Sequence, residues 1–398
     1  MLGNDDEMKR RRATMKHTLT LLIALLLASL AALYAAEKTK NLPLAEKRPH
    51  SFTYQNPIAS KDIPAIRDPQ IIPHEGAYYL IGSAPPFWGP KNGDGPSPGV
   101  KMWRSDDLLN WTFHKMLIDR RDVPERAWYR DRFWAPEIHQ KNGKFYLTFN
   151  CCNETSDTPH EQGVGVAVSG RIDGPYEILT REKPLLEKAN DASLLTDDDG
   201  RTYLFVSGIK GCEIDLEAIK VIGEVKQLIN REPGKWDGMI IEGPMAFKRN
   251  GKYYLLYSSN TRGYEIGYAT ADHPLGPYTK GKNSPFFGAQ SKKICDGRPP
   301  HLRCAFTGDP NSPYLGCGHN TIFKGPDGRD WICCHDEVVY DQNNPNHRYR
   351  DFFPTGNTKG KDNGPYRTEM LGIDPFWFDE NGDLFSNQPS YTIQTVTW

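Results

Sequence analysis

The sequence has almost no net charge and almost no stretch with the pattern of a long amphipathic helix. Its 49 Lys and Arg residues balance 50 Asp and Glu residues, which gives a formal net charge of −1. This balance gives no reason to expect nucleic acid or an anionic membrane surface as a partner. The 36 Gly, 31 Pro, 19 Tyr and 17 Phe residues favour many turns and short strands. The composition therefore predicts an all-β protein.

Only one long apolar run is present, and it lies near the N-terminus. Lys9–Arg12 and Lys16 precede an uncharged run from Leu19 to Ala36. This arrangement is typical of a secretory signal. It predicts residues 1–36 as a signal peptide, 37–55 as a linker, and a secreted or periplasmic protein. The alternative is an uncleaved anchor facing outside the cytoplasm, since about 18 residues can just span a bilayer; only then is a membrane a partner.

The eight cysteines show no spacing typical of zinc ligands. In an exported chain they could form disulfide bonds, and Cys295 and Cys304 bracket a short Pro-rich loop. The pairs Cys151-Cys152 and Cys333-Cys334 lie in strand-like runs, where buried free thiols are expected at least as much as disulfides.

A polar turn with Gly, followed by an aromatic-rich strand, recurs five times. The turns are Glu75-Gly76, Asn142-Gly143, Asp199-Gly200, Asn250-Gly251 and Asp327-Gly328. Asn-Gly and Asp-Gly pairs favour positive φ at both central positions, so each is predicted to be a tight hairpin turn. Five such units, roughly 50 to 80 residues apart, predict the four-stranded blades of a five-bladed β-propeller. The alternative is a β-sandwich with coincidental hairpins.

One catalytic or binding domain is therefore predicted over residues 56–398. Two Gly/Pro/Asn-rich stretches, Ser284–Gly318 and Asp341–Tyr366, are too long for simple blade turns. We expect them to overhang one face and to shape a pocket. If residues 285–316 and 343–364 close one end of a cleft, only the end of a chain-like ligand can enter it.

Three carboxylates, Asp68, Asp191 and Glu242, stand at the start of apolar strands, at what we interpret as the same phase of the repeat. Each alone could be a cap or an ion-pair partner, but three in phase on one side of a ring predict a shared site. Glycoside hydrolysis needs one carboxylic acid to protonate the leaving oxygen and one carboxylate to activate water or attack the sugar. A third acid nearby can raise the pKa of the proton donor.

The motifs around these acids resemble those of family-43 glycoside hydrolases, five-bladed propeller enzymes that act on arabinose- and xylose-containing polysaccharides. The motifs are Arg67-Asp68-Pro69, Trp134-Ala135-Pro136-Glu137, Asp191-Ala192-Ser193, Glu242-Gly243-Pro244 and Gly318-His319-Asn320. They follow the family's order at blade spacing. The chain departs from the commonest family pattern at two places. Glu137 stands where many relatives have Asp, and a long Cys-containing loop precedes His319. Both departures put the substrate in question more than the chemistry.

The resemblance implies inversion of configuration, with Asp68 as general base, Glu242 as general acid and Asp191 tuning the pKa of that acid. The acid and base carboxyls of an inverting enzyme lie roughly 6.5–9.5 Å apart. His319 resembles the family's channel histidine, which helps hold a calcium ion or water, and it could equally be a hydrogen-bonded structural histidine. Arg367 falls where the family often places an arginine near the catalytic subsite. No cofactor is required.

The aromatic residues Phe87, Trp88 and Trp134 are candidates for stacking on a sugar face, or alternatively for packing between blades. The sequence thus predicts an inverting exo-hydrolase of polysaccharides or oligosaccharides, an α-L-arabinofuranosidase or β-xylosidase. The open alternatives are an endo-acting arabinanase, a galactan-directed hydrolase, a phosphorylase or transferase, and a propeller that only binds carbohydrate or serves a structural role.

Overall fold

The computed structural model describes residues 51–63, 65–288, 300, 312–340, 366–387 and 389–398. The chain divides into two compact units, Met1–Phe52 with Thr397–Trp398, and Thr53–Val396. The predicted signal peptide or anchor lies outside the described residues, as does most of the two long stretches. Within the described ranges, no helix is long and apolar enough to cross a membrane.

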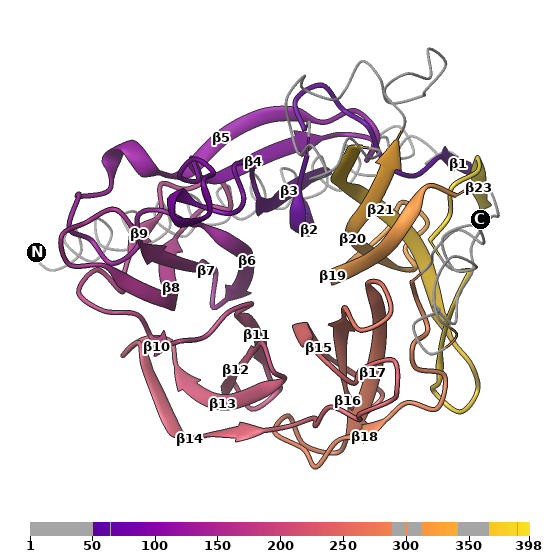
Figure 1. Cartoon of the computed structure of the whole chain (residues 1–398). Helices are drawn as coiled ribbons and strands as arrows, with labels where there is room; N and C mark the ends of the chain where they lie inside the picture. Colours follow the sequence, from indigo (N-terminus) through magenta and orange to yellow (C-terminus); the bar gives the residue numbers. More distant parts are fainter. Residues whose placement is uncertain (1–50, 64, 289–299, 301–311, 341–365, 388) are drawn as a thin grey trace, which may run out of the picture. The chain divides into compact units, whose positions relative to one another are not determined.

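The described residues of the second unit form five antiparallel sheets, the blades of a β-propeller, which confirms the predicted fold (Figure 1). The first blade is β2 (Arg67–His74), β3 (Ala77–Ser83), β4 (Gly99–Ser105) and β5 (Thr112–Asp119). The second is β6 (Trp134–Lys141), β7 (Lys144–Asn153) and β8 (His160–Ser169), with β9 (Glu177–Ile178) and β10 (Leu186–Glu187) both paired to β8. The third is β11 (Ser193–Thr196), β12 (Thr202–Val206), β13 (Lys210–Asp215) and β14 (Lys220–Gln227).

The fourth blade is β15 (Ile241–Arg249), β16 (Lys252–Ser259), β17 (Glu265–Ala271) and β18 (Thr279–Lys280). The fifth is β19 (Tyr314–Lys324), β20 (Asp330–Tyr340), β21 (Tyr366–Phe378) and β22 (Leu384–Ser386). The short strands β1 (Ser51–Tyr54) and β23 (Gln394–Thr397) and two short 3₁₀ turns, η1 (Pro90–Asn92) and η2 (Arg120–Asp122), lie outside the blades. In every blade the first strand in the sequence lies nearest the centre (Figure 1).

The hairpin turns follow the prediction in three blades and differ in two. Glu75-Gly76, Asn142-Gly143 and Asn250-Gly251 have positive φ at both positions. In β11–β12 and β19–β20 only Gly200 and Gly328 have positive φ. The last paired residues there are Thr196 with Thr202 and Lys324 with Asp330, so the loops are longer than two residues. The prediction of a tight turn with positive φ at both central positions was wrong at these two sites. A longer loop needs only one residue in the left-handed conformation, and glycine provides it.

Apolar side chains pack between neighbouring blades, on both faces of the middle strands. All five residues of β12 are buried, for example, and so are seven of the eight in β16. One core cluster joins the first and second blades around Phe149, and another joins the third and fourth around Tyr257. Because both faces are covered, most residues of these strands are apolar or aromatic and do not alternate with period two.

The ring closes where β2 contacts β19 of the last blade. The Asn56 side chain adds to this closure, since its Nδ2 donates to the carbonyl of Ile373 at 2.7 Å and its Oδ1 accepts from the Ile373 N–H at 3.0 Å. The residues before the first blade are thus bound to the last one.

The prediction of buried free thiols is confirmed for Cys151-Cys152 and Cys333-Cys334. Cys212 and Cys317 are also free and buried. Cys295 and Cys304 lie outside the described residues.

Candidate active site

Each blade carries a residue with positive φ within its innermost strand or just before it. The five residues are Asp68 (φ 52°), Ala135 (φ 42°), Asp191 (φ 57°), Gly243 (φ 58°) and His319 (φ 47°). In four of the blades the strand register shifts at this residue, so it belongs to a β-bulge. Four of the five are not glycine, and left-handed backbone is costly for such residues. A bulge re-aims a side chain, which accounts for side chains of three blades meeting at one point.

The prediction that the three acids occupy equivalent positions in their blades is right for Asp68 and Asp191 and wrong for Glu242. In the fourth blade Gly243 holds the equivalent position, and Glu242 precedes it by one residue. A Cβ atom on Gly243 would lie 3.1 Å from the His319 Cα. A side chain there would press on His319, so glycine suits this position, and the acid of this blade stands at the preceding one.

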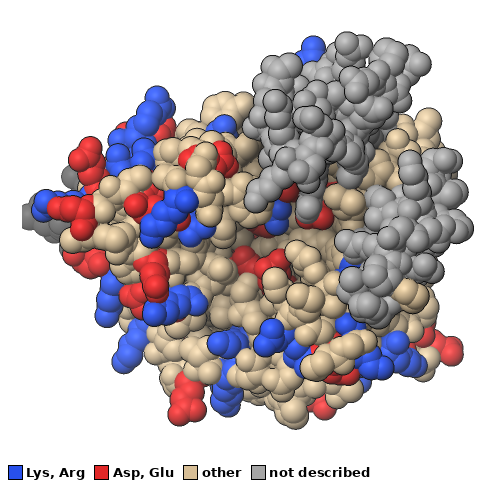
Figure 2. Space-filling view, in the orientation of Figure 1, with Lys and Arg blue, Asp and Glu red and all other residues tan. Residues whose placement is uncertain are grey.

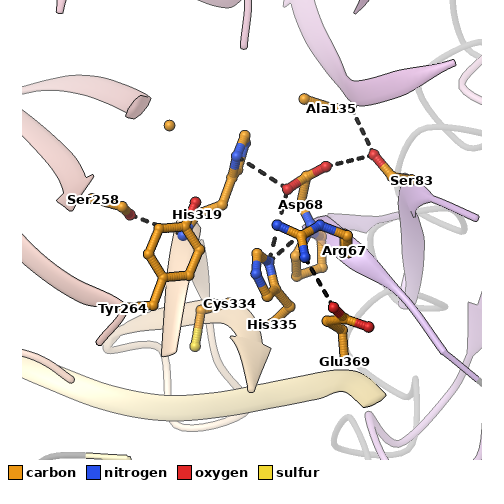
Figure 3. Close-up of polar contacts among 12 residues, drawn as sticks. Arg67, Asp68, Ser83, Ala135, Ser258, Tyr264, His319, Cys334, His335 and Glu369 are labelled. Carbon is orange, nitrogen blue, oxygen red and sulfur yellow. Dashed lines mark hydrogen bonds and ion pairs between the residues drawn. The ribbon is translucent and has the colours of Figure 1, made fainter. Parts of the chain in front are cut away.

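Asp68 is held by contacts from three other strands (Figure 3). Its Oδ2 accepts a hydrogen bond of 2.5 Å from Ser83 Oγ, and its Oδ1 lies 3.2 Å from His319 Nδ1. Its backbone N–H donates to His335 Nδ1 at 3.2 Å, so that ring nitrogen carries no proton. The contacts fix both the carboxylate and the strained backbone that carries it.

His319 lies between two of the three acids. Its Nδ1 is 3.9 Å from Asp191 Oδ2, compared with 3.2 Å from Asp68. Asp191 Oδ2 also accepts from the Gly243 N–H at 3.1 Å and from Ser207 Oγ. Burial alone would lower the pKa of His319, but the nearby carboxyls, led by Asp68 and Asp191, outweigh it and raise that pKa. His319 therefore lies where it can contact both acids through Nδ1.

Glu242 is half-buried beside a tyrosine. The Tyr264 hydroxyl donates a 2.5 Å hydrogen bond to Glu242 Oε1, which leaves Oε2 as the oxygen that can carry a proton. Burial is the largest influence that raises the pKa of Glu242, and the negative charge of Asp191 is the next. The carboxyl is therefore biased toward its protonated form, as a proton donor requires.

Tyr264 was not singled out from the sequence, although the sequence holds a signal for it. A Cβ atom at Gly318 would lie 2.3 Å from Tyr264 Cδ1, and one at Gly316 would lie 2.2 Å from Tyr264 N. The Gly-x-Gly spacing in β19 thus marks the space that the tyrosine occupies. Ser83, Ser207 and His335 were missed as well, and no local motif marks them.

His319 does not lie in a donor set that suits a directly bound calcium ion. Among the described residues, no group of three or more His, Cys, Asp or Glu side chains is arranged to hold a metal. Calcium takes six to eight oxygen ligands, whereas His319 turns Nδ1 toward Asp68. Burial raises the pKa of the neighbouring Glu137 to about 7, so that carboxyl is partly protonated near neutral pH.

An aromatic wall stands beside Asp68. Trp88 is 41% exposed and packs edge-on against Trp134, with ring centroids 6.1 Å apart. Arg67 lies 5.2 Å from the Trp88 ring centre, and its Nη1 pairs with Glu369 at 3.0 Å. The stacking prediction is wrong for Phe87, which is only 6% exposed. Its carbonyl accepts a hydrogen bond from Trp134 Nε1–H at 2.6 Å, so Phe87 helps to position the Trp134 ring.

Arg367 belongs to β21, where it pairs with Val339 of β20. Its side chain lies outside what the structure describes. The space-filling view shows acidic atoms at the floor of a hollow in the middle of the displayed face (Figure 2).

The family model "Glycosyl hydrolases family 43" matches residues 54–352. A β-D-galactofuranosidase of Aspergillus niger is 30% identical over 304 residues, which cover 70% of this chain and 72% of that enzyme. Xylosidase/arabinosidase 43B of Humicola insolens is 25% identical over 67% of this chain, and the match spans only 46% of that protein. An extracellular endo-α-(1→5)-L-arabinanase of Bacillus subtilis is 26% identical, with 54% of this chain and 67% of the relative covered.

Solved structures agree with these matches. The crystal structure of a thermostable family-43 glycoside hydrolase aligns with a TM-score of 0.63 at 25% identity, covering 86% of this chain and 98% of the other. An endo-1,4-β-xylanase from Bacteroides thetaiotaomicron aligns with a TM-score of 0.59 at 25% identity, covering 84% of this chain and 96% of the other.

Proposed function

The chain belongs to glycosyl hydrolase family 43, and from that premise we propose that it is an inverting exo-hydrolase that releases terminal arabinofuranosyl or xylosyl residues from polysaccharides or oligosaccharides. The observation that carries the proposal is the cluster of Asp68, Asp191 and Glu242 around the buried His319, whose pKa the nearby carboxyls raise. The names of the xylosidase/arabinosidase relatives support the choice of sugar.

Asp68 is the proposed general base. Its carboxylate removes a proton from a water molecule as the water oxygen attacks the anomeric carbon. The hydrogen bond from Ser83 and the contact with His319 hold the carboxylate in one orientation. A base held in this way has little freedom to lose when the water binds, which favours reaction.

Glu242 is the proposed general acid. As the bond from the anomeric carbon to the leaving oxygen breaks, Glu242 gives its proton to that oxygen, and Asp68 holds the proton taken from water. Tyr264 orients the carboxyl, and burial and the charge of Asp191 raise its pKa, which favours the protonated form. Exchange of protons with solvent then restores both groups.

A second candidate is hydrolysis of β-D-galactofuranosides. The β-D-galactofuranosidase of Aspergillus niger, which is 30% identical, supports this candidate. An endo-acting arabinanase remains an alternative, because the stretches proposed to close the cleft, 285–316 and 343–364, lie largely outside the described residues. A propeller that only binds carbohydrate would have no need of the three acids.

Hydrolysis of a glycoside panel tests the proposal. The substrates are the 4-nitrophenyl glycosides of α-L-arabinofuranose, β-D-xylopyranose and β-D-galactofuranose, together with arabino- and xylo-oligosaccharides. We expect release of arabinose or xylose, one residue at a time. Release of galactofuranose alone would select the second candidate, and internal cleavage without monosaccharide would select endo action. Binding without any turnover would contradict the enzymatic proposal.

We also propose that the chain acts outside the cytoplasm, after removal of residues 1–36. The basic and apolar N-terminal pattern supports this. The mass of the mature chain, isolated from the producing cell, tests it: a chain that keeps residues 1–36 in the membrane would contradict cleavage.

The pH dependence of turnover should move in opposite directions in two variants. Glu242 must be protonated to act, so activity is lost as the pH rises through its pKa. Tyr264→Phe removes a hydrogen bond that stabilises the carboxylate, so the pKa rises and the alkaline limb of the kcat profile moves up by about one pH unit. Asp191→Asn removes a neighbouring negative charge, so the alkaline limb moves down.

Tyr257→Phe is the matched control, because Tyr257 is also buried in the fourth blade and donates to Asp237 at 3.0 Å. Its alkaline limb should stay in place. A shift of Tyr264→Phe and Asp191→Asn in the same direction, or no shift in either, would contradict the assignment of Glu242 as the acid.

A further inference from the structure

A cavity of about 570 Å³ opens directly beside the proposed general acid. Glu242 forms part of its wall, and so does Ser207, whose hydroxyl donates to Asp191. The rest of the wall comes from the β12–β13 turn, the end of β14 and the connection from β14 to β15. The cavity is therefore lined by residues of the third and fourth blades and of the connection between them. Asp68 belongs to the first blade and does not line it.

The position of this cavity determines which part of a substrate it can receive. This step rests on the proposed function, in which Glu242 protonates the leaving oxygen. The sugar on the far side of that oxygen must lie next to Glu242. A cavity that shares the Glu242 wall is therefore placed for the leaving-group sugar and not for the sugar that is released.

Two cationic side chains, Lys210 and Arg231, line this cavity. The Lys210 chain runs back over Gly208, with its Cε 3.7 Å from the point where a Gly208 Cβ would lie. Arg231 Nη1 donates to the carbonyl of Met239 at 2.9 Å, which fixes the guanidinium across the loop. The space-filling view shows Lys and Arg side chains on the rim of the hollow, over the third and fourth blades (Figure 2).

Acidic neighbours do not neutralise these two cations. Glu232, next in sequence to Arg231, pairs with Lys280 at 2.7 Å, and Asp237 pairs with the same lysine at 2.6 Å. Within the described part of the chain, no ion pair joins Lys210 or Arg231 to a carboxylate. The largest influences on the pKa of Glu242 are burial, Asp191, Tyr264, His319 and Asp68. Tuning of the acid therefore does not account for the two cations.

The remaining wall suits a sugar ring. Met239 and Ile240 are 56% and 50% exposed, and they offer apolar surface to the C–H face of a ring. Asn190 lines the same cavity. Gln227 Nε2 donates hydrogen bonds to the carbonyls of Gly208 and Ile229. These bonds hold this part of the wall in place without a ligand.

We propose that this cavity is a leaving-group subsite that takes an anionic sugar residue, bearing a carboxylate or a sulfate, through Lys210 and Arg231. A fixed guanidinium presents paired donors that match the oxygens of either anion, and the lysine adds a second positive charge. The substrate class would then be a polymer whose acidic residues carry the terminal sugars that the enzyme removes.

Direct binding tests the proposal without relying on catalysis. The probes are trigalacturonate, a sulfated galactotriose and neutral galactotriose, each titrated calorimetrically into the full chain at low and at high salt. We expect one or both anionic probes to bind at least about tenfold more tightly than the neutral one, with the advantage reduced at high salt. Preference for trigalacturonate would assign a carboxylate, and preference for the sulfated probe would assign a sulfate.

The variant Lys210→Gln with Arg231→Gln should lose about tenfold or more of the affinity for the anionic probe. The matched control is Lys144→Gln with Lys220→Gln, which changes the charge equally at exposed residues outside this cavity and should keep that affinity. Equal losses in the two variants, or equal affinity of wild type for neutral and anionic probes, would overturn the subsite. Absence of any binding would overturn it too, while activity on the aryl glycosides would still report independently on the proposed function.

Discussion

Replacement of Asp68 by Asn is expected to lower kcat by about 10²–10⁴-fold on every substrate that the wild type hydrolyses. Asn has nearly the same shape and can still accept the hydrogen bond from Ser83, but it cannot take a proton from water. The loss should therefore be the same for good and poor leaving groups, because water attack is impaired whichever group departs. Steady-state kinetics on an aryl glycoside and on an oligosaccharide measure it.

Asp215→Asn is the control for this variant, since Asp215 ends β13, away from the three acids, and its carboxylate accepts from the backbone N–H groups of Glu217 and Ala218. It should retain wild-type turnover. An Asp68→Asn enzyme with turnover close to that of the wild type would show that another group activates the water.

Replacement of Glu242 by Gln is expected to have an effect that depends on the leaving group. Gln can keep the hydrogen bond from Tyr264 but has no acidic proton to give. Hydrolysis of oligosaccharides, whose leaving oxygen needs that proton, should fall by about 10²–10⁴-fold. A 2,4-dinitrophenyl glycoside, whose leaving group departs without protonation, should lose far less.

The ratio of the two losses is the measurement, because it cancels any general damage to the site. Thermal unfolding of the variant should match that of the wild type, since Gln replaces Glu with the same shape. Near-wild-type turnover of Glu242→Gln on an oligosaccharide would show that the acid is elsewhere.

The propeller and the three acids could be predicted from the sequence because their signals are local. A Gly-containing turn before an aromatic strand fixes a hairpin wherever it occurs, and five copies at blade spacing leave few other folds. The acids also stand in short motifs at the start of these strands. The phase of Glu242 could not be predicted, since it depends on the contact between Gly243 and His319 of another blade.

The residues that hold the acids could not be predicted, because the fold brings them from distant parts of the chain. His335, which binds the backbone of Asp68, is 267 residues away in sequence. Left-handed backbone at Asp68, Asp191 and His319 costs on the order of 1–3 kcal/mol at each position, so local preferences argue against the conformation that the site requires. Only the surrounding contacts make it stable.

The anomeric configuration of the first product tests the central claim most directly. Proton NMR during the first minutes of hydrolysis, before mutarotation, distinguishes the two anomers of the released sugar. A sugar of opposite configuration to the substrate is the predicted result, since water activated by Asp68 attacks from the face opposite the leaving group that Glu242 protonates. A product that retains the substrate's configuration would mean that a carboxylate attacks the sugar itself, and would contradict the roles proposed for Asp68 and Glu242.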